Sequence, residues 1–222
     1  MRAIDVAKYL IAKTQNAGDL ITNKKLQKIL YYVKAWGLVY FEDGVIDDPF
    51  EAWVHGPVCR SVYSTFNKFK YDPVSLEYKN GETSSMFIRA FIASHSSSEI
   101  ERRKVAIVDS IYLRYIGFSA AYLEEMTHNE KPWVEARNGC APEAHCSKRI
   151  SERTMAEFYH SQMFPPKKVV AKRMPSNFDT EVSQRIGGGF SSEGMSRKEV
   201  TSFLAQRVGR VSSFINPAWY ND

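Results

Sequence analysis

Apolar residues recur every three or four positions along the first three quarters of the chain, which is the spacing of amphipathic helices. The clearest example is residues 23–41, where Leu26, Ile29 and Val33 share one stripe. Thr22 or Asn23 can cap the first turn of this helix with a side-chain oxygen. Three lysines lie off the stripe: Lys24, Lys28 and Lys34. The same spacing predicts further helices over 3–14, 58–69, 86–94, 99–116, 119–126 and 151–163.

A short β element interrupts the helical pattern. Residues 49–54 alternate enough to predict a strand, and His55-Gly56-Pro57 ends it. Gly56 permits unusual backbone angles, and Pro57 suits the first position of the helix predicted next. Residues 71–85 are rich in turn formers and are compatible with a hairpin. We therefore expect a mainly α fold, a compact helical domain with a small β-strand or hairpin element.

Three segments have the Ser/Thr-x-x-Glu spacing of a capping box, in which a hydroxyl and a carboxylate each accept from a helix N-terminal N–H. They are 98–101, 127–130 and 196–199. The second predicts a helix that carries Trp133 and Arg137, followed by a loop over 138–148.

The chain changes character after Met163. Residues 164–222 hold nine Lys/Arg against five Asp/Glu, so +4 of the net charge of +5 lies in this quarter. Gly187-Gly188-Gly189 predicts a flexible linker, and apolar spacing resumes in a helix at about 197–215. We therefore divide the chain into a domain at 1–163 and a basic C-terminal extension at 164–222 that ends in an amphipathic helix.

Composition excludes several classes of protein. Apolar residues make up 44% of the chain and charged residues 25%, which is ordinary for a globular protein. No apolar run approaches the roughly 18 residues of a membrane span, and Asp5 and Lys8 interrupt what would be a signal peptide. Three cysteines, Cys59, Cys140 and Cys146, are too few for a disulfide framework. We expect reduced thiols and a cytoplasmic location.

Candidate chemistry is sparse. His55 and His128, with Trp133 and Arg137, could surround one pocket, but they could equally order local backbone. The sequence offers no nucleophile or orienting carboxylate at matched spacing, so we predict neither an enzyme nor a cofactor. Cys140, His145 and Cys146, with His128, depart from the spacing of structural zinc sites. Residues 189–196 mimic a phosphate-binding loop, but Met195 stands where its lysine should be.

Two groups of residues are candidates for binding a partner. Tyr32 and Trp36 could extend from the edge of helix 23–41, although core packing also explains them. The apolar face of helix 197–215 must bury against something, whether its own domain, a toxin groove or a second copy in a homo-oligomer. The candidates on this helix are Val200, Phe203, Leu204, Arg207, Val208 and Val211. Its four cations do not form the basic, aromatic-interleaved stripe of a nucleic-acid binder.

Three blocks resemble the Panacea domain of SocA-like antitoxins. The first is TNKKLQKILYYVKAW at 22–36, the second AWVHGPV at 52–58 with Val62-Tyr63, and the third runs from Tyr122-Leu123 to Trp133-Val134-Glu135-Ala136-Arg137. The resemblance ends with Ile150-Ser151 and Phe158-Tyr159, so it covers about residues 1–163. Its motif residues are Leu26, Gln27, Lys28, His55, Gly56, Pro57, Val58, His128, Trp133 and Arg137.

The resemblance implies a helical antitoxin that neutralises a separately encoded protein toxin by direct binding. In one branch of the family it implies a proteolytic adaptor for the toxin, and related domains occur on phages and prophages. The alternatives are a phage-associated interaction protein that acts on a host factor and a DNA-binding autoregulator. A pI of about 9.0 gives the last of these only weak support.

Overall fold

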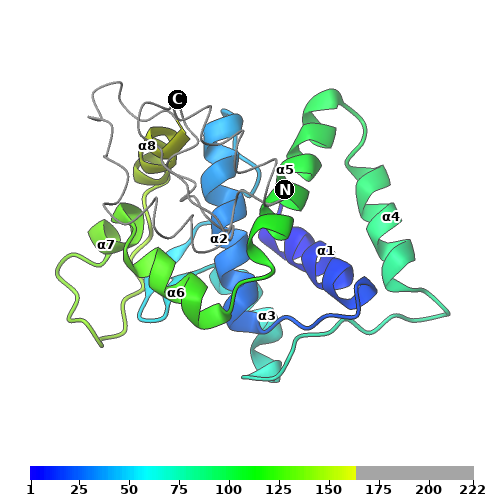
Figure 1. The fold of residues 1–222 in the computed structure, drawn as a ribbon, viewed down its shortest axis with the longest axis horizontal. Coiled ribbons are helices and arrows are strands. Elements are labelled where there is room, and N and C mark those ends of the chain that lie inside the picture. The colour runs from blue at the N-terminus through cyan, green and yellow to red at the C-terminus, as the bar shows by residue number, and fades with distance from the viewer. Residues whose placement is uncertain (164–222) are drawn as a thin grey trace, which may run out of the picture. The chain divides into compact units, whose positions relative to one another are not determined.

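The computed structural model describes residues 1–163, which form a mainly helical fold with one small β-hairpin (Figure 1). The helices are α1 Ala3–Asn16, α2 Asn23–Tyr40, α3 Arg60–Phe66, α4 Ser84–Ser94, α5 Glu99–Tyr115, α6 Ala120–His128, α7 Lys131–Ala136 and α8 Glu152–Met163. The strands are β1 Glu51–Trp53 and β2 Gly56–Val58, and a 3-10 turn, η1, covers Asn67–Phe69. The expected fold class is confirmed for this part of the chain. The extension and its helix at 197–215 lie outside the described residues.

Helix α2 is the centre of this fold, and α1, α3, α5, α6 and β2 all pack against it (Figure 1). Its first turn is capped as predicted, because the Thr22 hydroxyl accepts a hydrogen bond from Lys25 N–H. Side chains are buried around most of its circumference, as in a helix enclosed by its neighbours. Lys28 and Lys34, which lie off the apolar stripe in the sequence, are therefore buried as well.

The β-hairpin corrects the prediction for residues 55–58. Gly56 adopts φ +92° at the tight turn, a conformation that favours glycine, and the chain turns back at once. Pro57 then lies in β2, paired with Ala52 of β1, so it does not open a helix. The next helix begins at Arg60, two residues later than expected. In the described chain, residues 71–85 contain no regular strand, and only Pro73 makes an isolated bridge, to Thr22.

Serine hydroxyls begin three of the later helices. Ser98 accepts from Glu101 N–H at 3.1 Å, Ser119 from Tyr122 N–H at 3.1 Å and Ser151 from Thr154 N–H at 3.2 Å. The capping box predicted at 127–130 is wrong, because Thr127 and His128 form the end of α6 and Glu130 precedes α7. The box at 196–199 lies outside the described residues.

Candidate functional site

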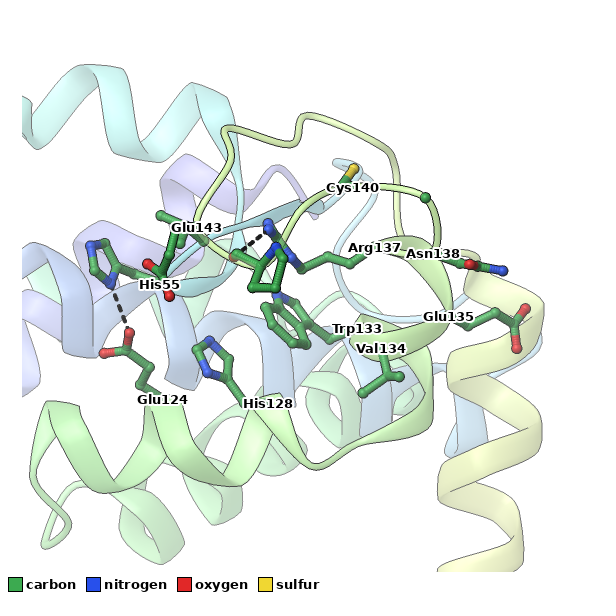
Figure 2. Close-up of a pocket in the computed structure, with 13 residues that line it drawn as sticks. His55, Glu124, His128, Trp133, Val134, Glu135, Arg137, Asn138, Cys140 and Glu143 are labelled. Carbon is green, nitrogen blue, oxygen red and sulfur yellow. Dashed lines mark hydrogen bonds and ion pairs between the residues drawn. The ribbon is translucent and has the colours of Figure 1, made fainter.

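A pocket of about 820 Å³ lies between the tip of the β-hairpin, helices α6 and α7, and the loop that follows α7 (Figure 2). Its lining residues come from segments far apart in sequence: Val54, His55, Glu124, His128, Trp133, Val134, Glu135, Arg137, Asn138, Gly139, Cys140, Pro142 and Glu143.

Helix α2 holds the hairpin that forms one wall of this pocket. The Gln27 side-chain carbonyl accepts a hydrogen bond from Cys59 N–H at 2.9 Å, and the Gln27 amide donates to Asn23 Oδ1 at 3.1 Å. The Lys28 ammonium donates to the carbonyl oxygen of Pro57 at 3.2 Å. Buried polar groups need such partners, so these side chains fix the second strand against α2.

Helix α7 and its C-terminal end hold the first strand in the same way. Trp133 Nε1 donates to the carbonyl of Trp53 at 3.1 Å, and Arg137 Nη1 donates to that of Ala52 at 3.1 Å. The Arg137 guanidinium is buried and lies 5.2 Å from the centre of the Trp133 ring. The hairpin is thus bound to helices on both sides through its own backbone.

The tip of the hairpin carries the most exposed imidazole of the pocket. His55 has a side-chain exposure of 70%, and its Nδ1 lies 2.8 Å from Glu124 Oε1 on α6 (Figure 2). Lys24 pairs with the other carboxylate oxygen of Glu124. Burial alone would raise the pKa of Glu124, but the hydrogen bonds from Lys24 and His55 outweigh it and hold the pKa below its usual value. Glu124 is therefore a charged link between α2, α6 and the hairpin.

His128 lies deeper in the pocket, where it stacks on Trp133. The two ring centres are 4.1 Å apart with an interplanar angle of 17°. Its Nε2 is buried without a hydrogen-bond partner among the described atoms. Burial lowers the pKa of His128, and the positive charges of Lys28 and Arg137 lower it further. The carboxylate of Glu124 opposes this shift without reversing it, so the site favours the neutral imidazole, which presents an aromatic surface.

Lys28 reaches the underside of the hairpin turn. Its Nζ and Cε would lie 2.9 Å and 2.7 Å from a Cβ added at Gly56, so the missing side chain of Gly56 makes room for it. Complete burial lowers the pKa of Lys28 to about 7, because the charged form is poorly solvated there.

The sequence-predicted residues are only partly brought together. His55, His128, Trp133 and Arg137 do line one pocket, whereas Leu26 and Val58 are buried apolar side chains. Glu124 and the loop wall at 138–143 were not predicted. Their positions depend on tertiary packing, and the Glu-rich helix sequence around Glu124 gave no signal that distinguished it from Glu125.

Two cysteines correct the expectation of reduced thiols. Cys140 and Cys146 form a disulfide in the loop after α7, and Cys59 is free and buried. The Cα atoms of Cys140 and Cys146 are 6.2 Å apart, a distance that a disulfide can span. Within the described range, no group of three or more His, Cys, Asp or Glu side chains is arranged to hold a metal ion. His145 instead packs edge-on against Trp53, with ring centres 5.7 Å apart.

The structure describes only two of the candidate partner-binding residues, Tyr32 and Trp36. Tyr32 is 1% exposed and donates its hydroxyl to Glu130, so of the two interpretations of this residue the structure favours core packing. Trp36 is half-buried and packs against Tyr159. Six further candidates lie outside the described residues: Val200, Phe203, Leu204, Arg207, Val208 and Val211.

Part of the chain is similar to a known family. Residues 26–134 match a family model described as Antitoxin SocA-like, Panacea domain. Neither the curated proteins nor the solved structures contain a significant match. The matched range begins with Leu26 in α2 and ends within α7 at Val134, so it includes the hairpin, most of the helices that anchor it and part of the pocket lining. No helix among residues 1–163 is both long and apolar enough to cross a membrane.

Proposed function

We propose that the protein, whose residues 26–134 match the Panacea domain of SocA-like antitoxins, is an antitoxin that neutralises a separately encoded protein toxin by direct binding. The proposal rests on the family match at residues 26–134. We also propose a cytoplasmic location, where the protein would meet a newly made toxin.

The way in which the motif side chains are used supports a binding role over a catalytic one. Lys28, Trp133 and Arg137 donate to backbone carbonyls of the hairpin, and Gln27 accepts from the N–H of Cys59, directly after β2. A side chain whose donors are engaged by buried backbone carbonyls cannot offer those donors to a substrate without leaving a buried polar group unpaired. These residues therefore hold the hairpin rigidly in place, which suits a surface that binds a partner rather than a site that transforms a substrate.

The rim of the pocket is the part of that surface that we assign to the toxin. Val134 is 51% exposed on α7, beside the Trp133 ring, and His55 projects from the hairpin opposite (Figure 2). A hollow with an aromatic floor and an exposed apolar edge suits a protruding side chain of a partner protein, since interface energy concentrates at such pockets.

Growth rescue tests the proposal directly. Each neighbouring gene is expressed from an inducible promoter, alone and with this protein, and colony counts and co-purification are scored. We expect one neighbour to be toxic alone and harmless with this protein, and the two products to co-purify. If every toxic neighbour stays toxic and unbound, the protein is not its antitoxin.

A matched pair of variants locates the toxin-binding surface. Val134→Asp places a charge at the pocket rim, and we expect it to weaken rescue by at least about tenfold in colony count. Met86→Asp is the control, because Met86 is 53% exposed on α4, on the other side of the fold (Figure 1). Circular dichroism of both variants establishes that they fold. Equal rescue by the two would move the binding surface elsewhere.

The amount of toxin distinguishes neutralisation by binding from proteolytic adaptation. If the protein only blocks its toxin, the amount of toxin stays constant or rises during rescue. If it delivers the toxin to a protease, the amount falls, and rescue disappears in cells that lack the protease.

A further inference from the structure

The disulfide lies in the wall of the pocket. Cys140 is half-buried and lines the pocket, whereas Cys146 is only 3% exposed. The bond closes a ring of seven residues within the loop that connects α7 to α8. Asn138, Gly139, Pro142 and Glu143, in or beside this ring, also line the pocket (Figure 2).

One buried guanidinium group organises the inside of this ring. Arg137 Nη2 donates to the carbonyl oxygens of Ala141 at 2.8 Å, Pro142 at 2.8 Å and Ala144 at 3.1 Å. Three carbonyls from a short segment converge on one nitrogen only if the segment is held in a tight curve. A covalent link between its two ends supplies that constraint by removing open conformations of the loop.

The same guanidinium group connects the ring to the opposite wall. Arg137 Nη1 donates to Ala52 in β1, and Ala52 N–H donates to the carbonyl of Lys148 at 2.8 Å. Ile150 N–H also donates to the carbonyl of Phe50 at 2.8 Å. The bonds of Lys148 and Ile150 hold the end of the loop on the segment around the first strand independently of the disulfide. Opening the disulfide therefore releases residues 140–146 while the fold persists.

We propose that Cys140 and Cys146 are a reversible thiol–disulfide pair that sets the shape of the pocket, with Arg137 transmitting the change to the β-hairpin. In the oxidised state the ring keeps its three carbonyl oxygens hydrogen-bonded to Arg137, and this wall of the pocket is fixed. In the reduced state the ring opens, the acceptors of Arg137 become mobile, and the hairpin loses part of its anchoring. This inference does not depend on the protein being an antitoxin.

The chemistry is a two-electron exchange with a dithiol reductant or a small-molecule disulfide. In reduction, a thiolate of the dithiol attacks Cys140 Sγ, the less buried sulfur, and the Sγ–Sγ bond breaks. Cys146 leaves as a thiolate and takes up a proton. The second thiol of the reductant then displaces Cys140 from the mixed disulfide, which leaves two protein thiols and an oxidised reductant. Oxidation by glutathione disulfide runs through the reverse exchange and yields two molecules of glutathione.

Purified full-length protein in glutathione buffers of graded potential tests the pair. Thiols are alkylated after denaturation and counted by mass, and amide hydrogen exchange is measured in the fully oxidised and fully reduced states. We expect one transition between one and three free thiols. Reduction should accelerate exchange by about tenfold or more in peptides covering 138–148 and 51–58, and leave α2 unchanged.

Two variants serve as controls. C140S/C146S should exchange at the fast rates in every buffer; if it does not fold, the two states of the wild type carry the test alone. C59S removes the buried free cysteine and should keep the full response. The proposal is overturned if the disulfide does not form at any glutathione ratio, if both states exchange alike, if α2 also accelerates, or if C59S abolishes the response.

Discussion

Glu130 is enclosed by tyrosine hydroxyls where α7 begins. Tyr32 donates to one of its carboxylate oxygens at 3.0 Å, and Tyr159 donates to the other at 2.6 Å. Burial raises the pKa of Glu130 to about 7, although the tyrosine donors oppose the shift. The fold therefore favours the protonated carboxyl, and its stabilising effect is complete below the unfolded pKa of about 4.5. That contribution is lost as the pH rises toward 7.

Glu130→Gln resembles the protonated carboxyl, because it keeps one acceptor oxygen and offers an amide donor to the other tyrosine hydroxyl, and it removes the titration. Relative to the wild type, we expect the variant to gain stability between pH 4.5 and 7, reaching on the order of 2 kcal/mol at pH 7. Urea unfolding at five pH values measures the difference. Glu125→Gln, at an exposed position of α6, is the control and should follow the wild type throughout. A constant difference across this range would mean that Glu130 does not titrate there.

The importance of Glu130 was not predictable from the sequence, because its partners lie 98 and 29 residues away. The same applies to Lys28 and Lys34, whose positions off an apolar stripe gave no sign of burial. The apolar spacing of one helix carries no information about the elements that pack around it. Helix α2 is enclosed by elements from the rest of the fold. Burial of a lysine depends on those neighbours.

At the scale of elements, the hairpin depends on a close approach between Gly56 and α2. A Cβ at residue 56 would meet Lys28 Cε at 2.7 Å and Thr127 Oγ1 at 2.9 Å. The positive φ of +92° adds backbone strain for any other residue. Both effects oppose a side chain at this position, so the turn requires glycine.

Gly56→Ala should therefore destabilise the fold by about 2–4 kcal/mol, the sum of backbone strain and overpacking. Gly18→Ala is the matched control, because Gly18 has φ +69° but nothing within 4 Å of an added Cβ. Gly18→Ala should lower the free energy of unfolding by only about 1 kcal/mol, from backbone strain alone. Thermal and urea unfolding measure both variants, and equal losses would contradict the packing argument.

Most helices were predictable from apolar spacing and caps, since both signals are local. Ser98, Ser119 and Ser151 begin helices where their sequence positions indicated. The errors occurred where a local signal competed with packing. Thr127 matches a capping box, but its hydroxyl donates to the carbonyl of Glu124 and it extends α6. Pro57 suits a helix start, yet the turn at Gly56 places it in a strand.

At the scale of the whole molecule, an ion pair joins the last described helix to the central one. The buried Lys34 ammonium lies 2.7 Å from Glu152 Oε1 in α8 and donates to the carbonyl of Ile46 at 2.8 Å. Lys34 thus links α2 to α8 and to the segment before the hairpin. A buried cation that loses its counter-ion is costly, because the remaining charge is poorly solvated.

Glu152→Gln should lower the free energy of unfolding by about 1–3 kcal/mol at neutral pH. In the same helix, Glu157→Gln removes the exposed pair with Arg153 and should leave stability unchanged. Urea unfolding of the two variants in parallel tests the difference. A similar result for both would show that α8 is held by apolar contacts alone.

The position of the motif side chains has a consequence for how relatives are compared. Gln27, Lys28, Gly56 and Arg137 maintain the interior architecture of the hairpin and can stay fixed while the outer surface diversifies. Two homologues could agree at each of these positions and still recognise unrelated targets. Agreement at these interior positions would therefore indicate a shared fold, and target preference has to be sought among the exposed side chains.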